Sequence, residues 1–211
     1  MSSIDNQDRI DAFVAEVQEG DADAFESLYE MFFPRIYKYV FYKAQQQDVD
    51  DLVAQVFIKA WSKISTYKKT DHRFSSWLFR IAHNTVIDYY RTHKPTEELA
   101  EYLPNENREL DPLHKVNQVF ASERVHRALR TLEDKYQQVI LLKFLQDLPN
   151  GEIADVMGVK ETSVRTLQFR ALKQLRSLLE EEDLRVKKRL EPEETADKKT
   201  GLLSLKRWFF R

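Results

Sequence analysis

The sequence predicts an all-α fold: two small helical domains joined by an acidic linker, the second ending in a helix-turn-helix. Three observations support this class. Glycine is rare, with 4 in 211 residues, so the chain is unusually free of helix breakers. Apolar residues recur at helical intervals through most of the chain. Three prolines fall within residues 95–112, where that period stops, and we therefore divide the chain there.

The division gives four segments. Residues 1–94 form the first helical domain, 95–118 the linker, 119–180 the second domain and 181–211 a charged extension. Residues 96–112 contain six acidic residues and one base, although the net charge of the whole chain is only −2. This charge segregation argues against indiscriminate nucleic-acid binding, but it leaves directed binding through local patches open.

The first domain is expected to begin with a short helix ended by Gly20. A second helix should run from Ala24 to about Gln46, with a kink or break at Pro34. A third helix follows acidic residues that favour a helix start. Its inward stripe is Leu52, Val53, Val56, Phe57, Ala60, Trp61 and Ile64. Its outward face, which suits docking of another protein, is Asp51, Gln55, Ile58, Lys59 and Ser62.

A fourth helix, expected from Ser75 to Arg91, has two stripes. The inward stripe is Leu78, Ile81, Ala82, Thr85 and Tyr89. The second stripe mixes aromatic, cationic and amide groups: Trp77, Arg80, Asn84, Ile87 and Arg91. Rings stack on bases, cations bind phosphates and asparagine can read a base edge, so this stripe beside the basic loop 65–73 favours single-stranded DNA binding. A lone Trp–Arg pair would more often be ordinary packing.

Residues 148–176 have the spacing of a helix-turn-helix. The inward positions are Ile153, Ala154 and Met157 in the first helix and Val164, Leu167 and Ala171 in the second, with Gly158 at the turn. The outward face of the second helix is Thr162, Arg165, Thr166, Phe169 and Lys173. Residues 160–176 hold five bases and one acid, which is typical of a helix that reads the major groove. The alternative is a plain helical hairpin with a solvated basic face.

Nothing in the sequence points to catalysis, and we expect no enzyme, no cofactor and no metal. There is no cysteine, and the five histidines (72, 83, 93, 114 and 126) lack the spacing of metal ligands. A phosphate-cradling glycine loop is also missing. The chain shows neither a signal pattern nor an apolar run of membrane-spanning length, so we expect a cytoplasmic protein.

Three segments, in this order, closely resemble the extracytoplasmic-function (ECF) group of bacterial sigma factors. Asp50–Trp61 resembles the helix of that family that binds core RNA polymerase. Phe74–Arg91 resembles its −10 reader, and Leu148–Leu172 resembles its −35 reader. The resemblance implies a sigma factor whose partners are core RNA polymerase and promoter DNA. Such a protein would bind the −10 element as a single strand and the −35 element as a duplex. The resemblance also implies a possible anti-sigma regulator.

The resemblance also implies residue roles. The polymerase-binding residues would be Asp51, Leu52, Gln55, Ile58 and Lys59. The −10 residues would be Lys68, Lys69, Phe74, Trp77, Arg80, Asn84 and Arg91. The −35 residues would be Thr162, Arg165, Thr166, Phe169, Arg170 and Lys173. This chain departs from the family at Ala54-Gln55, where Gln-Glu is usual, at Leu167, where arginine is common, and at Phe169, where histidine is frequent.

Two rival classes remain. An ordinary helix-turn-helix repressor or activator would have no use for the Asp50–Trp61 and Phe74–Arg91 segments, and a protein-only adaptor would leave the basic face of 160–176 unexplained. The end of the chain carries an apolar arc beside bases: Leu202, Leu203, Leu205, Trp208, Phe209 and Phe210. This Leu202–Phe210 segment suits docking on the chain's own domains, on a regulator or, least of all, on an anionic membrane surface.

Overall fold

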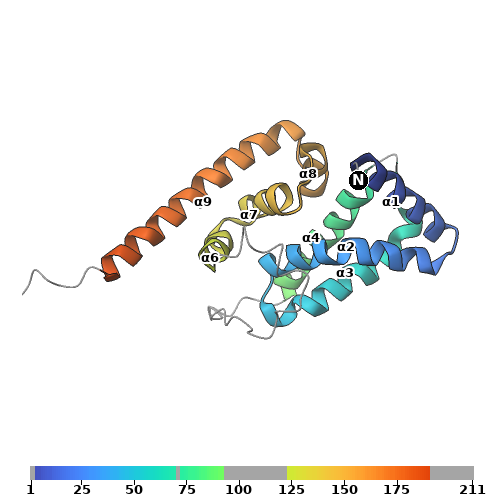
Figure 1. Cartoon of the computed structure of the whole chain (residues 1–211), viewed down its shortest axis with the longest axis horizontal. Coiled ribbons are helices and arrows are strands. Elements are labelled where there is room, and N and C mark those ends of the chain that lie inside the picture. Colours follow the sequence, from blue (N-terminus) through green and yellow to red (C-terminus); the bar gives the residue numbers. More distant parts are fainter. Residues whose placement is uncertain (1–2, 70–71, 93–122, 191–211) are drawn as a thin grey trace, which may run out of the picture.

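The computed structural model describes residues 3–69, 72–92 and 123–190, and every regular element in these ranges is helical (Figure 1). The first unit consists of α1 (Ser3–Gln18), α2 (Ala22–Lys43), η1 (Gln46–Asp48), α3 (Val49–Lys63), η2 (Ile64–Thr66) and α4 (Phe74–Thr92). The second consists of α6 (Glu123–Thr131), α7 (Asp134–Ile140), the π-helical turn η3 (Leu141–Leu145), α8 (Asn150–Met157) and α9 (Glu161–Leu190). The all-α class and the two helical units are confirmed.

Helix α2 is the centre of the first unit and packs against α1, α3 and α4. The carboxylate of Asp21 caps it by accepting hydrogen bonds from the backbone N–H groups of Asp23 and Ala24. A kink or break was expected at Pro34, and the helix continues through this exposed residue without a break. A proline removes only one backbone hydrogen bond, and the buried side chains on both sides of it hold the helix together.

The core of the first unit is aromatic. The rings of Phe32 and Phe74 pack edge to face with centroids 5.4 Å apart, and those of Tyr39 and Phe79 do so at 5.6 Å. The predicted inward positions of α3 are buried except Trp61, which is half exposed and lies edge-on against Phe25. Trp61 was therefore wrongly placed in the core.

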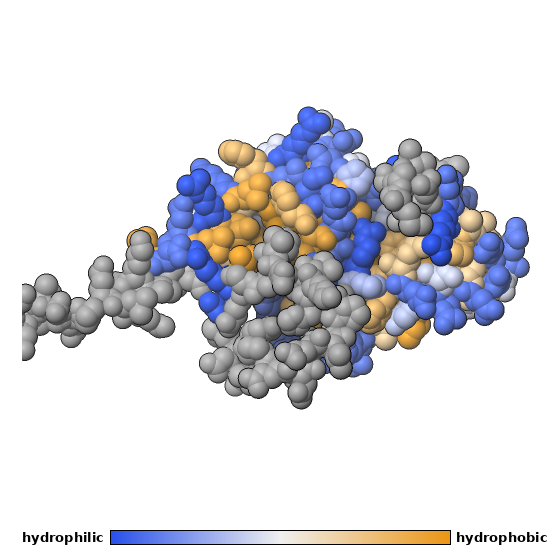
Figure 2. Space-filling model, viewed as in Figure 1, coloured by the Kyte–Doolittle hydropathy of each residue, from blue (hydrophilic) through white to orange (hydrophobic). Residues whose placement is uncertain are grey.

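In the second unit, α9 packs against α6, α7 and α8. Gly158 ends α8 with φ of +65°, a left-handed conformation that favours glycine, so the predicted turn is confirmed. Val164 and Ala171 of α9 are fully buried, and Leu167 is half buried against the core. In the view of Figure 2, hydrophobic residues gather between α9 and α7, while the α8–α9 corner is mostly hydrophilic.

The two units share one continuous hydrophobic core rather than lying apart, and α8 packs along α4. None of the described helices combines the length and apolarity needed to cross a membrane. Within the same described ranges, no group of three or more His, Asp or Glu side chains is placed to hold a metal ion.

Candidate nucleic-acid interface

The outward face of α9 is available for binding. Every residue expected there is exposed: Thr162, Arg165, Thr166, Phe169, Arg170 and Lys173. Phe169 stands out, since a phenylalanine with 70% of its surface exposed has no folding role. The start of α8 is fixed to α9 by the Gln168 Nε2–H group, which donates a 3.0 Å hydrogen bond to Asn150 Oδ1. A rigid, exposed helix with cations and one apolar ring can enter a major groove.

Three of the stripe residues expected on α4 are exposed, and the guanidinium of one of them, Arg91, lies 3.8 Å from the Asp88 carboxylate. Asn84 and Arg91 are exposed, at the middle and the end of the helix, and Ile87 between them is also exposed. Trp77 is half buried, with its ring against those of Tyr67 and Phe74 at centroid distances of 5.4 and 5.3 Å. The stripe is therefore most accessible toward its C-terminal half.

Two residues expected to touch a partner are buried instead. Leu52 is 3% exposed and Phe74 is 1% exposed. Leu52 lies on the inward side of α3, and Phe74 opens α4 with its ring against Phe32 of α2. Both expectations of direct contact are corrected by the structure, because these side chains belong to the hydrophobic core.

The basic loop before α4 is anchored to α1. Gln18 Nε2 donates 2.8 Å hydrogen bonds to the backbone oxygens of Ile64 and Tyr67. Tyr67 is buried, its hydroxyl donates to the His72 carbonyl oxygen, and burial raises its pKa to about 12. Lys68 and Lys69 are both exposed. The Lys69 ammonium pairs with the Asp11 carboxylate at 2.6 Å, and this pairing raises the pKa of Lys69.

The outward face of α3 forms a second exposed surface. Asp51, Gln55 and Ile58 are exposed, and Ile58 exposes 67% of its surface. Lys59 turns toward α4, where its Nζ donates a 3.1 Å hydrogen bond to Thr85 Oγ1. The half-exposed Trp61 is three residues from Ile58, so the two share a helix face. The sequence interpretation missed Trp61 here because it was assigned to the core.

Charged groups of α8 lie against the start of α4. The carboxylate of Glu152 accepts a hydrogen bond from the Ser75 hydroxyl, and its Oε1 lies 3.2 Å from Arg73 Nη1. Arg80, expected on the DNA side of α4, donates a 2.6 Å hydrogen bond from Nη2 to the Asp155 carbonyl oxygen. The sequence interpretation assigned no role to Glu152 or Asp155, which have no unusual spacing.

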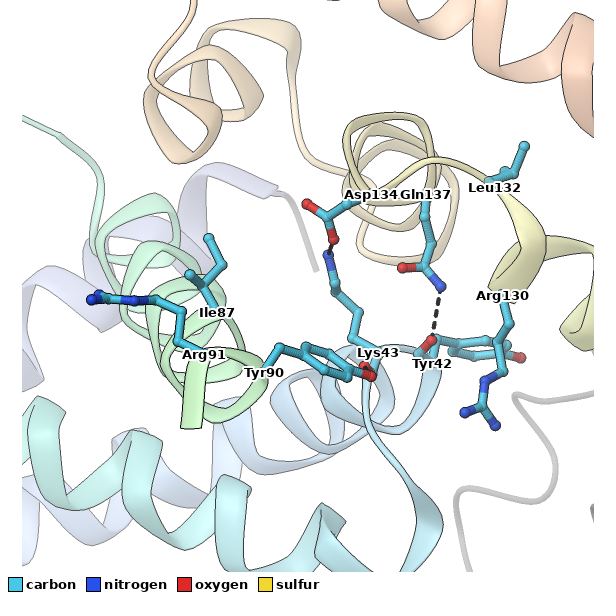
Figure 3. Close-up of a pocket in the computed structure, with 9 residues that line it drawn as sticks. All are labelled: Tyr42, Lys43, Ile87, Tyr90, Arg91, Arg130, Leu132, Asp134 and Gln137. Atoms are coloured by element: carbon cyan, nitrogen blue, oxygen red, sulfur yellow. Dashed lines mark hydrogen bonds and ion pairs between the residues drawn. The ribbon is translucent and has the colours of Figure 1, made fainter. Parts of the chain in front are cut away.

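A second group of polar contacts joins the two units at the C-terminal end of α2 (Figure 3). The Lys43 ammonium pairs with Asp134, and Gln137 Nε2 donates a 3.0 Å hydrogen bond to the Tyr42 carbonyl oxygen. Burial lowers the pKa of Lys43, while Asp134 opposes that shift. These residues line a cavity of about 490 Å³ together with Tyr90, Arg91 and others of both units.

Arg35 makes the third connection between the units. Its Nη2 donates a 2.9 Å hydrogen bond to the Gln146 carbonyl oxygen, and Gln146 Nε2 returns one of 3.1 Å to the Arg35 carbonyl oxygen. The guanidinium also lies over the rings of Phe32 and Phe79, 5.5 and 5.4 Å from their centroids. Burial lowers the pKa of Arg35, against the opposing charges of Glu152 and Asp147.

An exposed basic helix on one unit and an exposed amide and cationic stripe on the other are the features of a DNA-binding protein. Comparison with known proteins gives the family. The model described as Sigma-70 region 2 matches residues 28–96, and the one described as Sigma-70, region 4 matches residues 122–175. The chain belongs to the ECF sigma factors, which direct promoter-specific transcription initiation by RNA polymerase.

Individual relatives agree. The chain is 32% identical to the ECF sigma factor BldN of Streptomyces coelicolor over 174 residues, which are 81% of this chain and 66% of that protein. It is 30% identical to the ECF sigma-E factor of Escherichia coli over 168 residues, 75% of this chain and 87% of that one. The structure of CnrH in complex with the cytosolic domain of CnrY matches with a TM-score of 0.61 and 26% identity, covering 82% and 97% of the two chains.

Proposed function

We propose a division of work between the two units that follows the exposed surfaces. The first unit, residues 1–94, binds core RNA polymerase through Asp51, Gln55 and Ile58 and takes up the opened −10 strand along α4. The second unit, residues 119–180, reads the −35 duplex with the outward face of α9. The observation that carries this proposal is that both DNA-reading faces reach solvent on separate units of one chain.

Residues on each reading face have distinct chemistry. Asn84 offers an amide that can pair with a base edge, and Arg91 offers a cation for the backbone. On α9, Arg165 suits a guanine edge or a phosphate, and Phe169 suits a thymine methyl group. Residues 95–118 serve as the tether, which raises the effective concentration of each reader once the other is bound. The polymerase supplies the chemistry of RNA synthesis. Because bacterial RNA polymerase works in the cytoplasm, the chain acts there as well.

The test is transcription with purified core RNA polymerase. A library of genomic DNA fragments is transcribed with and without the chain, and the 5′ ends of the products are mapped. We expect new start sites that share two sequence elements at the −10 and −35 positions. Ile58→Glu should abolish these starts, whereas Leu184→Glu, at a leucine of equal 67% exposure on α9, should leave them unchanged. Starts without a shared upstream element would contradict the proposal.

A measurement of DNA binding without polymerase distinguishes a sigma factor from the repressor alternative. The basic patches of this chain are small, so few phosphates are neutralised and the isolated chain should bind duplex DNA weakly. Tight, sequence-specific binding of duplex DNA by the chain alone at physiological salt would favour a repressor instead.

A protein regulator is a further part of the proposal. CnrH was solved in complex with the cytosolic domain of CnrY. The apolar surface between α9 and α7 offers a place for such an anti-sigma partner (Figure 2). The Leu202–Phe210 segment, also expected to dock, lies outside the described residues.

A further inference from the structure

A cavity of about 490 Å³ lies where α2, α4, α6 and α7 meet (Figure 3). Small-molecule sites in proteins typically have volumes of roughly 300–1,000 Å³, so this cavity is large enough for a ligand. Apart from Ile87 and Arg91 at the end of α4, its lining includes no residue of the surfaces proposed to bind DNA or polymerase. Promoter recognition therefore does not account for the cavity.

The cavity contains a buried cation, the ammonium of Lys43. This side chain is 2% exposed and extends from α2, between residues of α4 and α7, toward Asp134 (Figure 3). An ammonium carries three N–H donors, and within the described ranges Asp134 is its only hydrogen-bond partner. Because a buried charge is costly unless its donors are satisfied, an acceptor oxygen placed in the cavity would stabilise this ammonium.

The charges of the lining residues are not balanced. Lys43, Arg91 and Arg130 supply three positive charges against the one carboxylate of Asp134, an excess of two. Arg91 lies 3.8 Å from Asp88, whereas Arg130 forms no ion pair with any residue in the part of the chain that the structure describes. A phosphate monoester carries a charge of about −1.5 to −2 at neutral pH and three acceptor oxygens, so it complements this lining.

The rest of the lining is aromatic and apolar. It consists of Tyr42, Ile87, Tyr90 and Leu132, with the amide of Gln137 beside them. Ile87 and Tyr90 are 39% and 37% exposed, and the Tyr90 hydroxyl donates to the Lys43 carbonyl oxygen, which fixes the ring. Burial raises the pKa of Tyr90, and the Arg130 cation opposes that rise, so the two groups are close enough to interact. A fixed ring beside a cation suits a ligand that has both a ring and an anionic group.

We propose that this cavity binds a small phosphate monoester that carries an aromatic ring, such as a mononucleotide. The phosphate lies between Lys43 and Arg130, and the ring lies against Tyr90 and Ile87. This ligand site goes beyond promoter recognition and does not depend on it. Because both units contribute to the lining, the bound ligand contacts both and stabilises the folded chain.

Isothermal titration calorimetry of the full chain tests the ligand class. Adenosine monophosphate (AMP) and phenyl phosphate carry both a ring and a phosphate, whereas inorganic phosphate lacks the ring and adenosine lacks the phosphate. We expect AMP and phenyl phosphate to bind at one site per chain, and each of the two fragments to bind at least roughly tenfold more weakly. Failure of AMP and phenyl phosphate to bind at millimolar concentration would overturn the proposal, as would equally tight binding of either fragment.

Variants of the two cations test the position of the phosphate. Arg130→Gln, at an exposed position, should weaken AMP binding roughly tenfold, as for loss of one charge-assisted hydrogen bond, and Lys43→Met should weaken it at least as much. The matched control is Arg176→Gln, an exposed arginine on α9 whose loss changes the net charge by the same amount, and it should bind AMP as the parent does. An unchanged affinity in both Arg130→Gln and Lys43→Met would show that AMP binds elsewhere and would overturn the assignment.

Methyl NMR of the full chain with labelled isoleucine tests the position of the ring. Ile87 lines the cavity, and its signal can be assigned from the Ile87→Val variant. Ile58 is exposed on α3 and does not line the cavity, so it serves as the internal control. We expect saturating AMP to shift the Ile87 signal and to leave the Ile58 signal in place. An Ile87 signal that does not move would overturn the site, whatever the outcome of the transcription experiment.

Discussion

The hydroxyl of Tyr89 in α4 donates a 2.6 Å hydrogen bond to the carboxylate of Asp48, immediately before α3. This bond joins the helix proposed to read the −10 strand to the start of the helix proposed to bind polymerase. Burial and the Asp48 carboxylate both raise the pKa of Tyr89, so the phenol keeps its proton and remains a donor at neutral pH. The bond therefore fixes α4 to the start of α3.

The first prediction concerns this bond. Tyr89→Phe should lower the free energy of unfolding by about 1.5–3 kcal/mol, because the lost hydrogen bond involves a charged acceptor. Chemical denaturation of the full chain measures the change. Tyr29→Phe, which removes the hydroxyl of an exposed tyrosine, is the matched control and should have almost no effect. Equal losses in the two variants would show that the Tyr89–Asp48 bond contributes nothing of its own.

The second prediction concerns the buried ammonium of Lys43. Asp134→Asn should destabilise the protein by about 1.5–3 kcal/mol, because a buried cation loses its charged partner. Adding Lys43→Met to Asp134→Asn should recover much of that loss, since the unpaired cation is then gone. Thermal unfolding of the two variants and the parent gives the comparison. A double variant less stable than Asp134→Asn alone would contradict this account.

The third prediction is a loss of stability in mild acid. Burial lowers the pKa of both His83 and His126 to about 4, and nearby cations (Lys43 for the first, Arg130 and Arg127 for the second) act in the same direction. Their ordinary pKa is about 6.5. Between these values the unfolded chain binds protons that the folded chain does not. The free energy of unfolding should therefore rise with pH across this window and level off above it.

Melting temperature measured from pH 4 to pH 8 tests this dependence. The double variant His83→Asn with His126→Gln should lose much of the slope below pH 6.5, because neither replacement side chain titrates there. If the slope survives unchanged in this variant, protonation of carboxylates accounts for it and the two histidines do not.

The fourth prediction separates the two DNA readers. Arg165→Ala should weaken recognition at the −35 element by about 1–3 kcal/mol, the range for one lost base contact, without affecting polymerase binding. Asn84→Ala should do the same at the −10 element. Transcription by the holoenzyme from promoters changed at one element at a time distinguishes them. Equal loss of polymerase binding in both variants would show that the faces have been wrongly assigned.

Local periodicity predicted most of the fold. Val164 and Ala171 are buried and Phe169 is exposed, as the helical spacing requires, because neighbours on the same helix decide which side faces the core. The turn at Gly158 was predictable for the same reason, since its conformation depends on one residue type.

Contacts between distant segments were not predictable in this way. Phe74 stands among polar and basic residues and resembles a ring that stacks on bases, but its burial depends on Phe32 in another helix. Glu152 has the pattern of a solvated carboxylate, and its donors Arg73 and Ser75 lie 79 and 77 positions earlier in the chain. The arrangement of the two units follows from such pairings and leaves no periodic signal.

Helix α9 is unbroken over 30 residues, so it extends roughly 45 Å at the usual rise per residue. Its first turns carry the face proposed to read DNA, and its last turns extend beyond the helices that pack against it (Figure 1). A continuous helix resists bending, so it acts as a lever. A regulator bound to its C-terminal turns would therefore tilt the end proposed to read DNA and change promoter choice from the far side of the molecule.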